Sequence, residues 1–207
     1  MFSEHPVLKV IELISKLNIP NNSIFHFSTY QYSYRRNIDL RKYLTVKSQD
    51  ITIEWLKKTL DNLELEWNLS FHGNISFPNG QEYFLPLIDF NTRRIDDEIL
   101  EIINFRLSKS KEILKYKNIL QEMTIYSSGR SFHGYGNTLL EFSEWKSFTV
   151  AILLLNYTRL YNELDTIVDT RWVAHRLLSG YPFLRWSNNS DHYYQYPKLF
   201  KQNFLLQ

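Results

Sequence analysis

Residues 125–137 read Ile-Tyr-Ser-Ser-Gly-Arg-Ser-Phe-His-Gly-Tyr-Gly-Asn, and the fold is best approached from this run. Ser131 and His133 lie two residues apart after a β-rich stretch, and side chains two apart on a strand point to the same face. The three glycines of the run leave the backbone open to a bound group. A hydroxyl and an imidazole can both donate hydrogen bonds to phosphate oxygens. The run therefore predicts a strand with a phosphate-binding pair, and taken alone it also fits an ordinary β-turn.

The composition around this run is that of a globular protein. The chain has 207 residues, of which 43% are hydrophobic and 22% charged, so it is long enough to bury a core without disulfides or a structural metal. The absence of cysteine excludes disulfides, zinc–thiolate sites and cysteine nucleophiles. A net charge of +2 permits local basic patches without indicating an obligate nucleic-acid binder. We expect one domain over 1–207.

The periodicity of apolar residues predicts alternating helices and strands. Helical spacing occurs at 7–17, 51–63, 95–107, 109–120 and 142–155, and strand-like patterns occur at 23–34, 64–77, 82–90 and 123–127. Asp50 is a plausible N-cap of the second helix. The sequence Pro78-Asn-Gly-Gln81 predicts a hairpin between two of the strands. This order favours the α+β class, with a mixed or largely antiparallel sheet flanked by helices.

An aspartate ends one of the predicted strands, Leu85-Pro-Leu-Ile-Asp-Phe-Asn91. Asp89 and Asn91 fall on the same face of that strand. A carboxylate at the end of a buried strand is costly unless it is paired, capping a turn or bound to a metal. One interpretation is therefore that Asp89 or Asn91 caps the turn into the next helix, and the other is that they form part of a functional site.

A second aspartate follows two apolar residues in Ile167-Val-Asp169, and arginines follow it. Asp169 can cap a short helix that begins near Trp172. The arginines, Arg171, Arg176 and Arg185, can form simple salt bridges, which contribute little when exposed. Alternatively they grip a triphosphate or a nucleic-acid backbone, since the guanidinium fork matches phosphate oxygens.

The order hydrophobic-Asp-Phe-Asn, then Ser-Phe-His, then Val-Asp with trailing arginines resembles the archaeo-eukaryotic primase superfamily, which includes the primase-polymerases. That family's pattern is a strand ending in hydrophobic-Asp-hydrophobic-acid, a Ser-x-His, and a hydrophobic-Asp. The resemblance covers roughly residues 80–187 and implies a primase-polymerase-like (RRM-like) catalytic core. Residues 1–80 precede it without a signature motif, and 188–207 follow it as an aromatic tail.

The resemblance also implies roles for individual residues. Asp89 and Asp169 would hold Mg²⁺ or Mn²⁺, which suit hard oxygen ligands. Ser131 and His133 would contact the phosphates of a bound nucleoside triphosphate, and Arg130, Arg176 and Arg185 are candidates for contacts with the triphosphate or the template. Asn91 stands where the family has a second acidic residue of the catalytic set. A neutral amide in place of a carboxylate should weaken a two-metal site.

A basic cluster precedes these motifs. Arg35, Arg36, Arg41 and Lys42 lie close to Tyr30, Tyr32 and Tyr34 in the sequence. Basic groups mixed with aromatic rings suit single-stranded nucleic acid, through phosphate attraction and base stacking. A solvated loop after a strand explains the same cluster equally well.

Three hypotheses for function follow from these patterns. The first is a primase-like nucleotidyltransferase that binds a nucleoside triphosphate, a divalent metal and a single-stranded template. The second is an inactive or weakened module of the same fold that binds nucleic acid or nucleotide beside a replication, helicase or mobile-element partner, and Asn91 motivates it. The third is an unrelated α+β protein with coincidental motifs. No leader or membrane-spanning stretch is evident, so we expect a cytoplasmic protein without a membrane partner.

Overall fold

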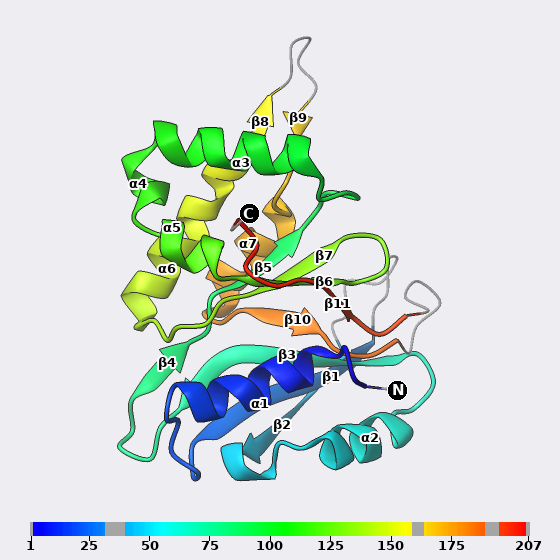
Figure 1. The fold of residues 1–207 in the computed structure, drawn as a ribbon. Coiled ribbons are helices and arrows are strands. Elements are labelled where there is room, and N and C mark those ends of the chain that lie inside the picture. The colour runs from blue at the N-terminus through cyan, green and yellow to red at the C-terminus, as the bar shows by residue number, and fades with distance from the viewer. Residues whose placement is uncertain (1, 32–39, 159–163, 189–194, 206–207) are drawn as a thin grey trace.

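The computed structural model describes residues 2–31, 40–158, 164–188 and 195–205. They form two antiparallel sheets, one above the other in Figure 1, each with its own helices. The fold is of the α+β class, as the sequence predicts, although the strands divide between two sheets and a small two-stranded ribbon, β8 (Tyr157–Thr158) and β9 (Leu164–Asp165). No helix in the described part of the chain is long and apolar enough to cross a membrane.

The lower sheet, sheet A, has the strand order β10-β3-β1-β2, with β4 paired to β3. Its strands are β1 (Ile24–Gln31), β2 (Arg41–Lys47), β3 (Trp67–Ser76), β4 (Glu82–Phe84) and β10 (Phe183–Arg185). The predicted hairpin at 78–81 joins β3 to β4. Helices α1 (Pro6–Lys16) and α2 (Ile53–Asp61) lie over one face of the sheet (Figure 1). On that face Phe27 packs against Trp55 of α2, with 4.8 Å between ring centroids.

Both helices of sheet A begin at residues with clear capping contacts. His5 caps α1 by accepting a hydrogen bond from the amide of Val7, and Pro6 occupies the first turn, where its missing N–H costs nothing. Thr52, not Asp50, caps α2, because its hydroxyl accepts from the amide of Trp55 at 3.0 Å. Asp50 instead ends a short 3-10 turn, η1 (Ser48–Asp50), so its prediction as a cap is wrong.

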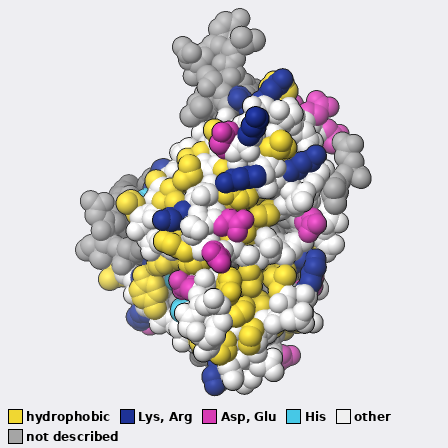
Figure 2. Space-filling model, turned by 90° about the vertical axis from the view of Figure 1, so that its left-hand side faces the viewer, with side chains coloured by type: hydrophobic (Ala, Val, Ile, Leu, Met, Phe, Trp, Pro, Cys, Tyr) yellow, Lys and Arg dark blue, Asp and Glu magenta, His cyan; other side chains and the backbone are white. Residues whose placement is uncertain are grey.

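The upper sheet, sheet B, has the order β11-β6-β7-β5 and carries the run quoted at the outset. Its strands are β5 (Leu87–Phe90), β6 (Thr124–Ser127), β7 (Phe132–Tyr135) and β11 (Lys198–Lys201). The helices around it are α3 (Asp97–Lys109), α4 (Lys111–Leu114), α5 (Lys117–Gln121) and α6 (Phe142–Ala151), which continues into the 3-10 turn η2 (Ile152–Leu155). On the side formed by α4, α5 and α6, exposed hydrophobic side chains are interspersed with charged ones (Figure 2).

The chain passes from sheet A to sheet B within a stretch that the sequence predicts as one strand, 82–90. The strand divides at Leu85-Pro86, because proline has no amide to donate to a continuing ladder. Leu85 donates to the carbonyl of Gly73 at 2.7 Å, and Pro86 accepts from Gly136 at 2.8 Å. The crossing therefore uses backbone contacts to both sheets within two residues.

Trp186 joins the two sheets through their shared core. Its ring is fully buried and stacks on Phe71 of sheet A at 4.9 Å, while its indole N–H donates to the hydroxyl of Tyr135 of sheet B at 3.0 Å. His5 Nε2 also donates a hydrogen bond to the Trp186 carbonyl, at 2.8 Å. The buried apolar side chains of both sheets belong to one continuous core, so the position of sheet B relative to sheet A depends on this packing.

Replacing Gly73 by alanine should destabilise the crossing. A methyl group there would lie 2.7 Å from Cγ of Pro182 and 3.0 Å from the carbonyl oxygen of Leu85, and neither neighbour is a flexible chain end. We expect a loss of about 1–3 kcal/mol in the free energy of unfolding, measured by urea titration. The double variant Gly73→Ala/Pro182→Ala should recover part of the loss, because it removes the closest atom; an unchanged midpoint in the single variant would contradict the close packing.

Candidate active site

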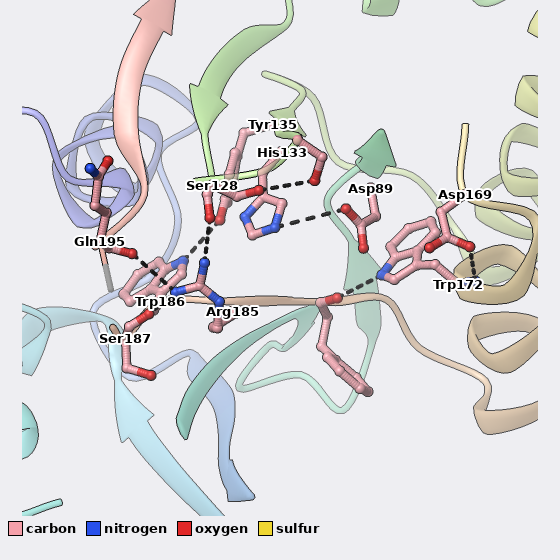
Figure 3. Close-up of polar contacts among 12 residues, drawn as sticks. Asp89, Ser128, His133, Tyr135, Asp169, Trp172, Arg185, Trp186, Ser187 and Gln195 are labelled. Carbon is pink, nitrogen blue, oxygen red and sulfur yellow. Dashed lines mark hydrogen bonds and ion pairs between the residues drawn. The ribbon is translucent and has the colours of Figure 1, made fainter. Parts of the chain in front are cut away.

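The two predicted aspartates and the predicted histidine lie in one row at the edge of sheet B. Asp89 of β5 pairs in register with His133 of β7, and His133 Nε2 lies 3.8 Å from Asp89 Oδ1. On the other side of β5, Asp169 donates its amide to the carbonyl of Asp89 at 2.9 Å. A bridge between Phe90 and Val168 places residues 89 and 169 opposite each other, so their side chains share a face (Figure 3).

The charge of Asp89 is strongly disfavoured in this setting. Burial is the main cause, the nearby carboxylate of Asp169 adds to it, and together they raise the pKa of Asp89 to about 8 against the opposing pull of Arg185 and Arg176. The side chain keeps 25% of its surface exposed. In the absence of a cation, Asp89 is therefore largely protonated at neutral pH.

His133 is a neutral imidazole in this row. Burial holds the pKa of His133 well below its usual range, and the guanidinium of Arg185 lowers it further. Its Nδ1 atom is buried and has no hydrogen-bond partner among the described residues. A neutral imidazole has one donor and one acceptor nitrogen, so the ring can serve Asp89 on one side and a bound group on the other.

Asp169 also caps a helix, as the structural interpretation of its sequence suggests. Its Oδ1 accepts from the amides of Arg171 and Trp172 at 2.8 and 3.0 Å, at the start of α7 (Thr170–Ser179). Both hydrogen bonds use the same carboxylate oxygen. The cap therefore fixes the direction of the side chain and leaves Oδ2 outside these two bonds.

The turn between β6 and β7 carries Ser131 and Arg130. Ser128 donates its amide to the carbonyl of Ser131 at 2.9 Å, and their hydroxyls lie 3.1 Å apart. Gly129 has a φ of 107°, a value that residues with a Cβ rarely adopt, so the tightness of this turn requires glycine. Ser131 is partly buried two residues before His133, and Arg130 is exposed at the tip.

The two later arginines are buried beneath the row. Arg185 is 5% exposed and donates to the carbonyl of Ser128 at 2.6 Å, to that of Gln195 at 3.3 Å and to that of Ser187 (Figure 3). Arg176 of α7 is 7% exposed, and its guanidinium carbon lies 3.4 Å from the ring centroid of Phe183. Arg185 thus ties the Ser128 turn to the segment after β10. The positive charges of Arg185 and Arg176 both act to lower the pKa of Asp89, against its burial.

The predicted nucleic-acid-binding cluster divides between described and undescribed residues. Arg41 lies in β2, with its guanidinium over the rings of Tyr30 and Phe183 at 4.8 and 4.3 Å. Lys42 is exposed, pairs with Glu64 at 3.2 Å and lies over the ring of Trp67. Arg35 and Arg36 lie outside the described residues. Arg41 and Lys42 are therefore strand residues, not part of a solvated loop.

The oxygen donors at the end of β5 are of the kind that hard divalent cations prefer. Asp89 and Asp169 supply carboxylates on one face, and Asn91, two residues beyond Asp89, carries an amide oxygen while its nitrogen donates to Thr166. Burial is the main cause of the raised pKa of Asp89, and the neighbouring carboxylate of Asp169 adds to it, as two carboxylates without a cation between them do. The described residues contain no cluster of three or more His, Cys, Asp or Glu side chains able to hold a metal.

Sequence reasoning missed the polar residues of β3. Asn68, Ser70, His72 and Asn74 are all buried and alternate with the apolar residues of that strand. The signal was present, because this alternation is visible in the sequence beside the apolar one that predicted the strand. Which residues this polar alternation faces depends on β2 and β10, the strands that complete sheet A beside β1 and β3. The positions of these two strands could not be predicted from local pattern.

Replacing Asp89 by asparagine should change how stability depends on pH. A folded-state pKa above the unfolded value means that the folded protein keeps a proton that the unfolded chain releases, so the wild type loses stability as pH rises from about 4 to about 8. Asparagine is neutral throughout. We expect the free energy of unfolding of Asp89→Asn, relative to that of the wild type, to increase by at least about 1 kcal/mol between pH 4 and pH 8, because a shift of a single pKa unit already corresponds to about that energy. Urea unfolding at each pH measures it. Parallel pH profiles of the two proteins would refute the raised pKa.

Comparison with known proteins supports the resemblance seen in the motifs. A search among curated proteins and a search among solved structures each find no match to this chain. The family model described as AEP-like, archaeo-eukaryotic primase 1D-like, matches residues 47–198, which is most of the chain and includes every residue of the row. The antiparallel α+β architecture agrees with a primase-like fold. The chain therefore belongs to the archaeo-eukaryotic primase 1D-like family.

Proposed function

We propose that this protein is a primase-type nucleotidyltransferase that joins nucleotides on a single-stranded template. The observation that carries the proposal is the row His133–Asp89–Asp169, which three separate segments of the chain build on one face. A divalent cation bound by these carboxylates would offset the burial and the repulsion from Asp169 that together raise the pKa of Asp89. Membership of a primase family supports the same chemistry.

The residues of the row have distinct proposed roles. Asp89, Asp169 and the amide oxygen of Asn91 would hold Mg²⁺ or Mn²⁺, which when bound supplies positive charge against the triphosphate and the attacking 3′-oxygen. As a neutral group, His133 would donate its one N–H to a phosphate oxygen. Loss of the Asp89 proton on metal binding would make metal affinity rise with pH.

The arginines and the β6–β7 turn would position the triphosphate. Ser131 and Arg130 come from the turn that opens β7, and the backbone bond between Ser128 and Ser131 fixes that turn. Arg185 supports the same turn from below through the carbonyl of Ser128. Arg176 and Arg185 would add a positive field beneath the phosphates, because both already act on the carboxyl of Asp89. A replication or helicase protein that delivers the template remains an expected partner.

Incorporation of labelled nucleotide on a primed single-stranded template, with Mn²⁺ or Mg²⁺, tests the proposal. The wild type should extend the primer, and Asp89→Asn should lower the rate by about 100-fold or more, the scale seen when a charge-stabilising group is lost. Asn91→Asp adds a third carboxylate and should lower the Mn²⁺ concentration required for half-maximal rate. Asp61→Asn, an exposed aspartate at the end of α2, is the matched control and should behave as the wild type.

Two outcomes would overturn the proposal. One is extension that Asp89→Asn leaves unchanged, since the row would then have no part in the reaction. The other is a folded wild type that extends no primer with either metal while Asn91→Asp is equally silent. Activity that appears only in Asn91→Asp would instead identify an intact site that a single neutral side chain has disarmed.

A second candidate function is a metal-independent binding module of the same fold. The observation in its favour is that two residues of the proposed metal site already make structural hydrogen bonds. Asp169 caps α7 through Oδ1, and Asn91, at the position of the missing acid, donates its amide nitrogen to Thr166. Such a module would bind single-stranded nucleic acid in EDTA, with affinity falling as salt rises, and would show no incorporation with any of the variants above.

A further inference from the structure

A polar face of sheet A lies on the side away from α1 and α2. Phe27 and Phe71 point toward the helices, so the neighbouring positions on the same strands point to the opposite face. Ser28 of β1 pairs with Tyr43 of β2 and with Ser70 of β3, and His72 pairs with Phe183 of β10. The face therefore combines polar and aromatic side chains from four strands.

The inner layer of this face is a closed hydrogen-bond network. The hydroxyl of Ser28 lies 2.8 Å from that of Ser70 and 2.9 Å from His72 Nε2, and it accepts from Arg41 Nη1 at 2.7 Å. Both serines are fully buried and His72 is 2% exposed. Burial first, and then the charge of Arg41, lowers the pKa of His72 to about 3, so the ring is neutral. These hydrogen bonds hold the inner layer in place, and because His72 is neutral, the positive charge of the layer comes from the guanidinium of Arg41.

The outer layer is a set of stacked rings and guanidinium groups. His72 stacks on Tyr181 with centroids 4.7 Å apart and planes at 16°, and the edge of Tyr43 meets His72 at 6.0 Å. The hydroxyls of Tyr43 and Tyr181 lie 3.1 Å apart. Tyr43 is 66% exposed, although its contacts with Tyr181 and His72 hold the ring in one orientation. A ring presented this way is ready to pack against a flat ligand.

Positive charge lies on the same face as Tyr43, around the ring of Phe183. The ring of Phe183 has the guanidinium of Arg41 at 4.3 Å and that of Arg176 at 3.4 Å. Arg176 also links this surface to the row, because it lies in α7, seven residues after Asp169 and so about 10 Å along the helix axis. Aromatic faces with guanidinium groups are the combination that single-stranded nucleic acid requires, since its bases stack and its phosphates carry negative charge.

We propose that the ring of Tyr43, held in place by Tyr181, is a stacking platform for an unpaired base of single-stranded nucleic acid, with Arg41 beside it facing the phosphates. The inference rests on the proposed function, because the strand it holds would be the template of the neighbouring site. It differs from the sequence-based interpretation in its residues. Tyr30, one of the tyrosines beside the basic cluster, is only 9% exposed and lies under Arg41, whereas Tyr43 presents its ring to solvent.

The test measures binding without metal, so that catalysis does not enter. Fluorescence anisotropy of labelled 15-mers of deoxythymidine and of uridine is recorded in EDTA for the wild type and three variants. Tyr43→Ala should raise Kd by about 5- to 100-fold on at least one of the strands, the range for loss of one base–aromatic stack. Tyr43→Phe keeps the ring and should stay within about twofold of the wild type. Tyr83→Ala removes a tyrosine of β4 that packs on Phe77 instead, and should change nothing.

A strand with abasic sites separates stacking from charge. The wild type should bind it more weakly than the intact strand, and Tyr43→Ala should cause no further loss, because the group that the ring contacts is already absent. Equal loss on intact and abasic strands, unchanged binding by Tyr43→Ala, equal affinity for blunt duplex, or no measurable binding by the wild type would each overturn the platform.

Primer extension that persists in Tyr43→Ala with unchanged binding would overturn the platform alone. Strand binding that depends on Tyr43 without any extension would overturn the nucleotidyltransferase alone.

Discussion

The pairing of β5 with residues 167–169 is the constraint on which the rest of the arrangement depends. Two backbone hydrogen bonds, from Asn91 to Ile167 and from Asp169 to Asp89, close this short ladder. The chain leaves sheet A at Pro86, crosses sheet B, and returns through α7 to β10, the outer strand of sheet A. The ladder therefore fixes where α7 starts, and with it the positions of Arg176 on the helix and Arg185 on the strand.

The same ladder creates an electrostatic conflict. It buries the carboxyl of Asp89 and places a second carboxylate on the same face, and these two effects, burial first, raise the pKa of Asp89 to about 8. The two buried arginines lower the pKa of Asp89 only in part. Arg185 donates hydrogen bonds to backbone carbonyls, and Arg176 lies against the ring of Phe183. Strongly shifted pKa values cluster at functional sites, so this pair is the natural candidate for the site of the proposed function.

Local sequence was enough to predict the features that depend on neighbouring residues. Turn chemistry predicts the 78–81 hairpin, and apolar spacing over 7–17 predicts the first helix. The order of the motifs was enough to predict that Asp89, His133 and Asp169 lie together. The break at Pro86 was also present in the sequence, but the apolar run on both sides of it suggested one strand. The proline's missing donor outweighed that run.

Features set by distant residues could not be predicted from the sequence. The strand β2 exposes most of its side chains, so it has little apolar pattern and owes its structure to pairing with β1. The partners of Arg185 are carbonyls from three separate segments, and no local pattern identifies them. Asp169 shows why both interpretations of one residue can hold together. Its cap on α7 uses Oδ1 for both hydrogen bonds and leaves Oδ2 outside them, so the cap is compatible with the metal-holding role that we propose for this side chain.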